Sequence, residues 1–161
     1  MQTEPLLQRK GWFAIDGVQA GDRTLAEQLT GLEPMLAEVS GRDVLDLGCA
    51  EGLIARTCLD RGARRVIGID NNRAFIDRAN SLALDPRRAR FWFGDLNQGP
   101  DADDQAVCHS DIVLALAIIH KLQDPARALR QWAAFAWRLF VIRLPLGSEV
   151  AGYLAVITLH M

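Results

Sequence analysis

The chain has 161 residues, of which 50% are hydrophobic and 24% are charged. This composition suits one globular domain with a sizeable core and excludes a disordered or fibrous protein. A formal net charge of −2 gives no overall field that would gather nucleic acid. The three cysteines have neither paired nor metal-ligand spacing, which predicts no metal site and a reducing, cytoplasmic location rather than a secreted disulfide scaffold.

Neither end of the chain has the pattern of a targeting or membrane segment. Glu4 and Pro5 stand where a signal peptide would be apolar. The hydrophobic segment 139–161 is interrupted by Arg143 and Pro145, which makes it unsuited to crossing a bilayer. We therefore expect a soluble protein with no membrane partner.

Residues 1–42 precede the strongly patterned part of the chain. Helical spacing over 23–41, with Thr24 three residues before Glu27, predicts a capped helix. We expect this N-terminal segment to form a lid or a packing helix. Two aromatic residues upstream are expected to seal the hydrophobic core rather than to contact a substrate: Trp12 and Phe13.

Strands and helices are predicted to alternate from residue 43 onward. Apolar runs of strand length recur at 43–48, 65–70, 89–96, 110–119 and 138–145. Segments with helical spacing lie between them, at 53–62, 72–84 and 124–137. Such alternation predicts a doubly wound α/β domain over 43–161, with a mostly parallel sheet and ligands at the carboxyl ends of its strands.

The turn after the first of these strands is rich in glycine. Gly48 and Gly52 allow the backbone to approach a ligand closely, because glycine lacks a side chain and adopts positive φ readily. A dinucleotide-binding fingerprint would need glycines at positions 48, 50 and 53, where this chain has Gly48, Ala50 and Leu53. An NAD-binding domain is therefore disfavoured.

The pattern formed by Asp46, Gly48, Ala50 and Gly52 resembles the first motif of the class I S-adenosylmethionine-dependent methyltransferases. That motif is an acidic residue, one further residue and then Gly-x-Gly-x-Gly, and here alanine replaces the middle glycine. The resemblance extends over residues 43–145. It implies the Rossmann-like fold of that family, S-adenosylmethionine as the cofactor and a methyltransferase activity of the EC 2.1.1 class.

Two further acidic residues stand where the family binds the rest of the cofactor. Asp70 ends the second strand, where a carboxylate accepts hydrogen bonds from both ribose hydroxyls, a feature shared with NAD enzymes. Asp95 follows the third strand, where the family often has an acid that accepts from the adenine amino group, and Leu96 supplies the next backbone amide. The resemblance implies this cofactor-binding set: Asp46, Gly48, Cys49, Ala50, Gly52, Asp70, Asn71, Asp95, Leu96 and Ala115.

The segment 111–125, DIVLALAIIHKLQDP, resembles the fourth motif and the following loop of small-molecule methyltransferases. Its apolar ALAI turn argues against enzymes that methylate amino groups of DNA bases, which usually carry Asn/Asp-Pro-Pro-aromatic there. His120 and Lys121 are the candidate catalytic residues, since a histidine is able to take a proton from a hydroxyl acceptor near neutral pH. A purely structural role for His120 stays open. We predict methyl transfer to an oxygen or nitrogen atom of a small molecule.

Two alternatives to a small-molecule enzyme stay open. One is a non-catalytic module that holds the cofactor, as a partner subunit. The other is a methyltransferase for tRNA or another RNA, because the segment 12–18, WFAIDGV, resembles the opening of enzymes that alkylate wobble uridine in tRNA. An RNA substrate would need a basic surface, for which the arginine-rich segment 61–90 is the candidate.

The C-terminus departs from the family. The family normally continues after its fifth strand with a helix and two antiparallel strands, whereas residues 146–161 suffice for one strand, at 152–159. A shortened sheet would leave an open edge, which proteins pair or cover. We therefore expect a homo-oligomer or a partner that covers this edge.

Overall fold

A computed structural model describes residues 11–15, 20–83, 85–98, 109–146 and 150–158. The main sheet has six strands in the order β5-β4-β3-β6-β7-β8. These strands are β3 (Asp43–Leu47), β4 (Arg65–Asp70), β5 (Ala89–Phe93), β6 (Ser110–Leu116), β7 (Ala136–Leu146) and β8 (Val150–Thr158). Residues 99–108, between β5 and β6, lie outside the described residues.

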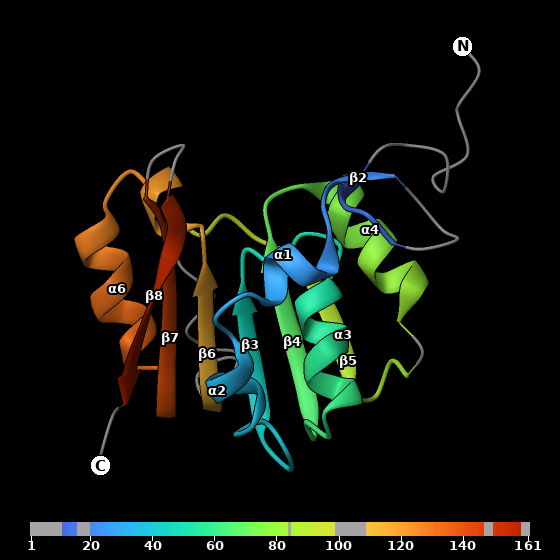
Figure 1. The fold of residues 1–161 in the computed structure, drawn as a ribbon, viewed down its shortest axis with the longest axis horizontal. Coiled ribbons are helices and arrows are strands. Elements are labelled where there is room, and N and C mark those ends of the chain that lie inside the picture. The colour runs from blue at the N-terminus through green and yellow to red at the C-terminus, as the bar shows by residue number, and fades with distance from the viewer. Residues whose placement is uncertain (1–10, 16–19, 84, 99–108, 147–149, 159–161) are drawn as a thin grey trace.

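All neighbouring strands except the last pair are parallel. β3 lies in the centre and pairs with β4 on one side and with β6 on the other. β8 runs antiparallel to β7, from Leu139↔Thr158 to Leu146↔Val150. The predicted doubly wound, mostly parallel sheet is confirmed. β3 is the first strand of this sheet in the chain; β4 and β5 are added on one side of it, and β6, β7 and β8 are then added on the other side (Figure 1).

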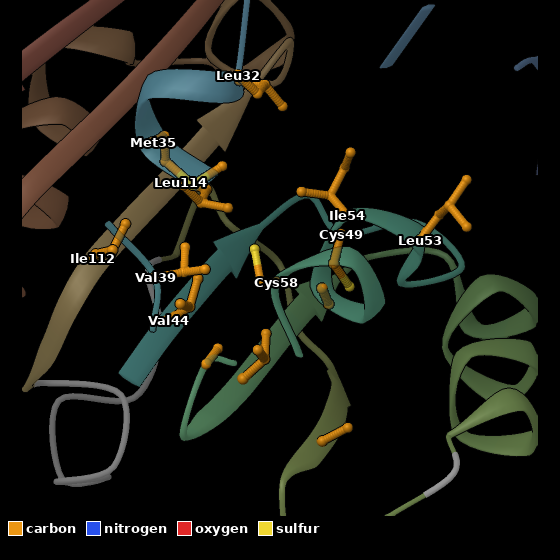
Figure 2. Packing of buried hydrophobic residues seen from close by; sticks show 14 of the residues in the cluster. Leu32, Met35, Val39, Val44, Cys49, Leu53, Ile54, Cys58, Ile112 and Leu114 are labelled. Carbon is orange, nitrogen blue, oxygen red and sulfur yellow. The ribbon is translucent and has the colours of Figure 1, made fainter. Parts of the chain in front are cut away.

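Helices cover both faces of this sheet. α3 (Leu53–Asp60), α4 (Arg73–Leu82) and the short α2 (Glu33–Leu36) contribute to one buried cluster, and α6 (Pro125–Ala133) contributes to the other. Strand residues alternate between the faces, so that Val44 belongs to the first cluster and Leu45 to the second. Figure 2 shows the first cluster, in which side chains of β3, β6, α2 and α3 meet.

The N-terminal segment adds a small two-stranded sheet and a broken helix. β1 (Gly11–Phe13) pairs with β2 (Gly21–Arg23), and α1 (Leu25–Leu29) follows at once. Thr24 caps α1 together with Glu27 in a reciprocal capping box, as the spacing predicts. The single helix predicted over 23–41 is wrong, because Gly31 at φ +77° ends one helix before the next begins.

Two boundaries near the end of the chain also differ from the prediction. The helix expected over 124–137 ends at Ala133, and β7 already begins at Ala136. β6 ends at Leu116 and is followed by the 3₁₀ helix η2 (Ile119–Lys121), where continued strand was expected. Among the described helices, none has the length and apolar character that a membrane span needs.

Candidate functional site

A cavity of about 750 Å³ opens at the carboxyl ends of the central strands. Its floor is formed by the ends of β3, β4 and β6 and by the turns that follow them, and the N-terminal segment borders its other side. Ligands of doubly wound sheets bind at this edge, where the strand order reverses. The cavity is therefore the candidate site. Most residues of the predicted cofactor-binding set line it: Asp46, Gly48, Cys49, Ala50, Asp70, Asn71, Asp95 and Leu96.

The glycine turn brings its backbone to the cavity in left-handed conformations. Gly48 has φ +81°, and its N–H donates to the carbonyl of Ile69 at 2.8 Å. A Cβ on Gly48 would lie 3.1 Å from the side chain of Ile118, which also lines the cavity. Ala50, which replaces the family's middle glycine, has φ +46° and so keeps the left-handed turn at some cost in strain.

Asp46 is the most deeply buried acid of the site, with 3% of its surface exposed. Burial, together with the nearby charge of Asp70, raises the pKa of its carboxyl to about 7, although Arg143 acts in the opposite direction. A cationic ligand in the cavity would favour the ionised form of this carboxyl.

Asp70 organises the turns on either side of it. One carboxylate oxygen, Oδ2, accepts the N–H of Ala50 at 2.9 Å, and Oδ1 accepts the N–H of Asn72 at 2.9 Å. Asn72 in turn caps α4 through the N–H groups of Ala74 and Phe75. Each oxygen of a carboxylate accepts two hydrogen bonds, so both retain capacity for ligand hydroxyls.

Asp95 shapes the turn after β5. Its Oδ1 accepts the backbone N–H and the side-chain Nδ2–H of Asn97, each at 3.0 Å. The Oδ1 of Asn97 accepts the N–H of Gln123 at 2.9 Å, which ties this turn to the loop after η2. Asn97 lines the cavity and was missed by the sequence analysis, because its role depends on a contact with a distant loop.

Three predicted site residues do not line the cavity. The Ala115 side chain belongs to the buried cluster on the α6 face, whereas its neighbours Leu116 and Ala117 line the cavity. Gly52 is buried, and a Cβ there would lie 2.6 Å from the ring of Phe91, so its absent side chain serves packing. His120 is exposed on η2 and does not line the cavity either.

Lys121 and Trp12 lie together at the cavity. The Lys121 ammonium stands 5.3 Å from the centroid of the Trp12 ring, a distance at which cation–π attraction operates. Phe13 is buried in the core as expected, with 4% exposed. Trp12 is half-buried and packs against the same core cluster, as expected, and it also lines the cavity.

Cys49 is buried beside the turn, with 2% exposed. Burial raises the pKa of its thiol well above the usual range, and the neighbouring Asp46 and Asp70 add to this. A thiol held protonated is a poor nucleophile. Cys49 therefore fills space against Gly68, whose absent side chain leaves room for its sulfur.

Two contacts that fix the cavity were not foreseen. Glu51, in the glycine turn, is buried and accepts the backbone N–H of Trp12 at 2.7 Å and that of Phe13 at 3.4 Å. Arg143, at the end of β7, donates to the backbone carbonyl of Gln28 at 2.6 Å and to its Oε1 at 2.8 Å. The only sequence signal was an acid inside the turn and an arginine at a strand end.

The residues of the cavity fit S-adenosylmethionine, the cofactor that the sequence implies. The cofactor is cationic at its sulfonium and amino groups, and the floor presents the carboxylates of Asp46, Asp70 and Asp95. Burial is the main cause of the raised pKa of Asp46, and a cationic group bound beside this carboxyl would lower that pKa. Hydroxyl groups find remaining acceptor capacity on Asp70.

A model of a family described as "Methyltransferase domain" matches residues 44–136. A tRNA U34 carboxymethyltransferase from Alteromonas mediterranea is 26% identical over 126 residues, which cover 76% of this chain and 38% of that protein. A ubiquinone biosynthesis O-methyltransferase from Leptothrix cholodnii is 27% identical over 99 residues, 62% of this chain and 41% of that protein. The chain thus spans about two fifths of the length of these relatives.

A solved structure has the same fold. It is an S-adenosylmethionine-dependent methyltransferase from Mesorhizobium loti, 26% identical, with a TM-score of 0.65 over 74% of this chain and 54% of that one.

Proposed function

Because this chain belongs to the methyltransferase domain family, we propose that it binds S-adenosylmethionine in the cavity and transfers the methyl group to an oxygen or nitrogen atom of a small molecule. The family predicted from the sequence is confirmed, and with it S-adenosylmethionine as the cofactor. The activity of the whole protein, its acceptor and its division into segments 1–42 and 43–161 are parts of the proposal.

One observation carries the proposal. Three acids from three successive strand ends, Asp46, Asp70 and Asp95, line a single cavity beside the left-handed glycine turn. In the proposed complex Asp70 accepts the ribose hydroxyls, Asp95 accepts the adenine amino group, and the turn receives the amino-acid end near Asp46. Adenine, ribose and the amino-acid end of the cofactor then follow the strand order β5-β4-β3 across the sheet.

The cofactor supplies an activated methyl group on a sulfonium. The protein then has to align the acceptor and exclude water. The N-terminal segment contributes Trp12 and Gln28 to the cavity wall, which suits the role of a lid. Lys121 also lines the cavity and is positioned to orient an acceptor. His120 lies outside the cavity and is therefore not placed to act as a base on that acceptor.

The positions of the arginines favour a small acceptor over RNA. Arg64 and Arg65 both donate to Asp43 at 2.8 Å, and Arg88 donates to the carbonyl of Ala63 at 2.7 Å. Asp43 begins β3, so these arginines lie at the sheet end opposite the cavity, and they are partly neutralised there. A tRNA acceptor, suggested by the name of the Alteromonas mediterranea relative, is the alternative.

Binding is tested first, with the demethylated product. S-adenosylhomocysteine should raise the melting temperature of the protein, and NAD should not. Asp70→Ala should weaken the calorimetric affinity for S-adenosylhomocysteine by roughly 1.5–3 kcal/mol, because charge-assisted bonds to two hydroxyls are lost. Asp77→Ala, at an exposed position of α4, is the matched control and should bind normally. An unchanged affinity in Asp70→Ala would place the ribose elsewhere.

Catalysis is tested by transfer of a tritiated methyl group. Extracts of small metabolites and of RNA are offered separately, and label is expected in the metabolite fraction. Label in RNA would select the tRNA alternative. Binding without any transfer to either fraction would select the non-catalytic module.

A further inference from the structure

Both acidic and cationic side chains line the cavity. The floor carries the carboxylates of Asp46, Asp70 and Asp95, at the ends of the strands. Three cationic side chains also line the cavity, and we call them the cationic wall: Arg23, Lys121 and Arg143. The acidic floor suits the cationic cofactor. The cationic side chains are then available to a second ligand in the same cavity, the methyl acceptor.

Arg143 links β7 to α1. Both of its terminal nitrogens donate to Gln28 of α1, at 2.6 and 2.8 Å. Burial lowers the pKa of this guanidinium; Asp46 raises it, and the charge of Arg23 lowers it further. Arg23 is thus close enough to be repelled, and a negative group between these side chains would relieve that repulsion.

Arg23 is held in place by its backbone. It ends β2, and its carbonyl accepts the N–H of Ala14 at 2.7 Å, next to the pairing of Phe13 with Arg23. Gly21 begins β2, and a Cβ there would collide with the backbone of Phe13, so only glycine allows this close pairing. The Arg23 side chain itself is exposed.

Lys121 lines the same cavity from η2, the 3₁₀ helix that follows β6. Its ammonium lies over the ring of Trp12 in β1, and β1 is the strand that pairs with β2. Glu27 also lines the cavity and lies close enough to Arg23 for their charges to attract, and it accepts the backbone N–H of Thr24 at 2.7 Å and the Thr24 hydroxyl at 3.0 Å. Among the described residues, no carboxylate forms an ion pair with Arg23 or Lys121.

We propose that the methyl acceptor is an anion whose carboxylate or phosphate group is bound by Arg23 and Lys121, in the cavity whose floor is acidic. This inference rests on the proposed function, because it takes the floor to be the cofactor's place. It names the acceptor class: the anionic group anchors the molecule on the wall, and the atom that receives the methyl group points toward the floor. Arg143 acts as a positioning residue for the wall.

The test uses the full chain saturated with S-adenosylhomocysteine, so that the cofactor's own carboxylate is already bound. Citrate, inorganic phosphate and an oligouridylate of nine nucleotides are titrated into this complex by calorimetry. Arg23→Gln and Lys121→Gln should each weaken binding of a probe roughly three- to tenfold, the loss of one partly exposed charge-assisted contact. Arg130→Gln, an exposed arginine of α6 away from the cavity, should leave the affinity unchanged.

The probes distinguish the sources of the anion. Wall-dependent binding of citrate or phosphate identifies a small anionic acceptor, and wall-dependent binding of the oligouridylate alone identifies an RNA phosphate. The inference is overturned if no probe binds, if binding is the same in all variants, or if Arg23→Gln and Lys121→Gln weaken only S-adenosylhomocysteine. Failure of the wild-type chain to bind S-adenosylhomocysteine would instead overturn the proposed function.

Discussion

At the scale of single residues, the site places an acid where its ionisation is costly. Asp46 lies in the core beside the cavity, close to a second acid. Its pKa is raised to about 7 from a model-peptide value of 3.8. The folded protein therefore binds more protons than the unfolded chain between these two values, and the free energy of unfolding falls as the pH rises through that window.

Replacing Asp46 with Asn should remove this fall. We expect the ligand-free Asp46→Asn protein to be more stable than the wild type at pH 8, by an amount on the order of 2–4 kcal/mol, and to differ little from it at pH 4. Urea unfolding at both pH values measures the difference, with the exposed Asp77→Asn as the control. Parallel stability profiles for wild type and Asp46→Asn would show that the carboxyl titrates normally.

A second prediction separates backbone strain from packing at the glycines. Gly41 and Gly52 have nearly the same φ, +70° and +77°, but a Cβ on Gly41 meets nothing within 4 Å, and one on Gly52 lies 2.6 Å from the Phe91 ring. Gly41→Ala should cost about 1 kcal/mol of stability for the left-handed conformation. Gly52→Ala should cost roughly 3 kcal/mol or more, because overpacking adds to the strain.

Thermal or urea unfolding of the two alanine variants measures this difference. Phe91→Leu, made in the Gly52→Ala background, should recover part of the loss by giving the methyl group room. Equal losses in both alanine variants would mean that Gly52 is needed for its conformation alone.

At the scale of elements, the Glu51 side chain connects the N-terminal segment to the cofactor turn. Glu51 sits in that turn and accepts the N–H groups of Trp12 and Phe13 in β1. Glu51→Gln should weaken the attachment of β1. The amide keeps one oxygen acceptor, but its NH₂ group would then face one of the two backbone N–H groups that Glu51 accepts. We expect a stability loss of about 1–3 kcal/mol.

Hydrogen exchange locates the effect of Glu51→Gln. The amides of residues 12 and 13 should lose protection, while those of the central strands β3 and β6 keep it. Glu33→Gln, at an exposed acid paired with Arg61 at 3.4 Å, is the control. Unaltered protection of residues 12 and 13 would show that β1 is held by its other contacts.

At the scale of the whole molecule, the sheet ends in two border strands. Among the described strands, β8 pairs with β7 alone and β5 with β4 alone. An unpaired strand edge is a template for pairing with another chain. We keep the proposal that the protein self-associates, and expect its weight-average sedimentation coefficient to rise with concentration. A constant monomer value up to high concentration would contradict it.

Much of the fold was predictable because its signals are local. Strand and helix positions between 43 and 146 follow from hydrophobic periodicity, and Asp70 and Asp95 follow from where strands end. Ala115 was misplaced by one residue, because side chains alternate between sheet faces and Leu116 is the neighbour that faces the cavity. Contacts between distant segments, such as Arg143 with Gln28, leave no periodic signal in the sequence.

The bond between Arg143 and Gln28 also bears on how the site assembles during folding. The part of the floor that carries Asp46, Asp70 and Asp95 comes from consecutive βα units, whose strands pair over short stretches of chain, as β3 does with β4 and β4 with β5. The wall requires two residues separated by 115 positions to meet. Because contacts of high sequence separation form slowly and a nascent chain emerges from its N-terminus, the acidic floor should be in place on the ribosome before α1 acquires its partner on β7. The N-terminal segment would therefore wait, already synthesised, for a strand near the other end of the chain.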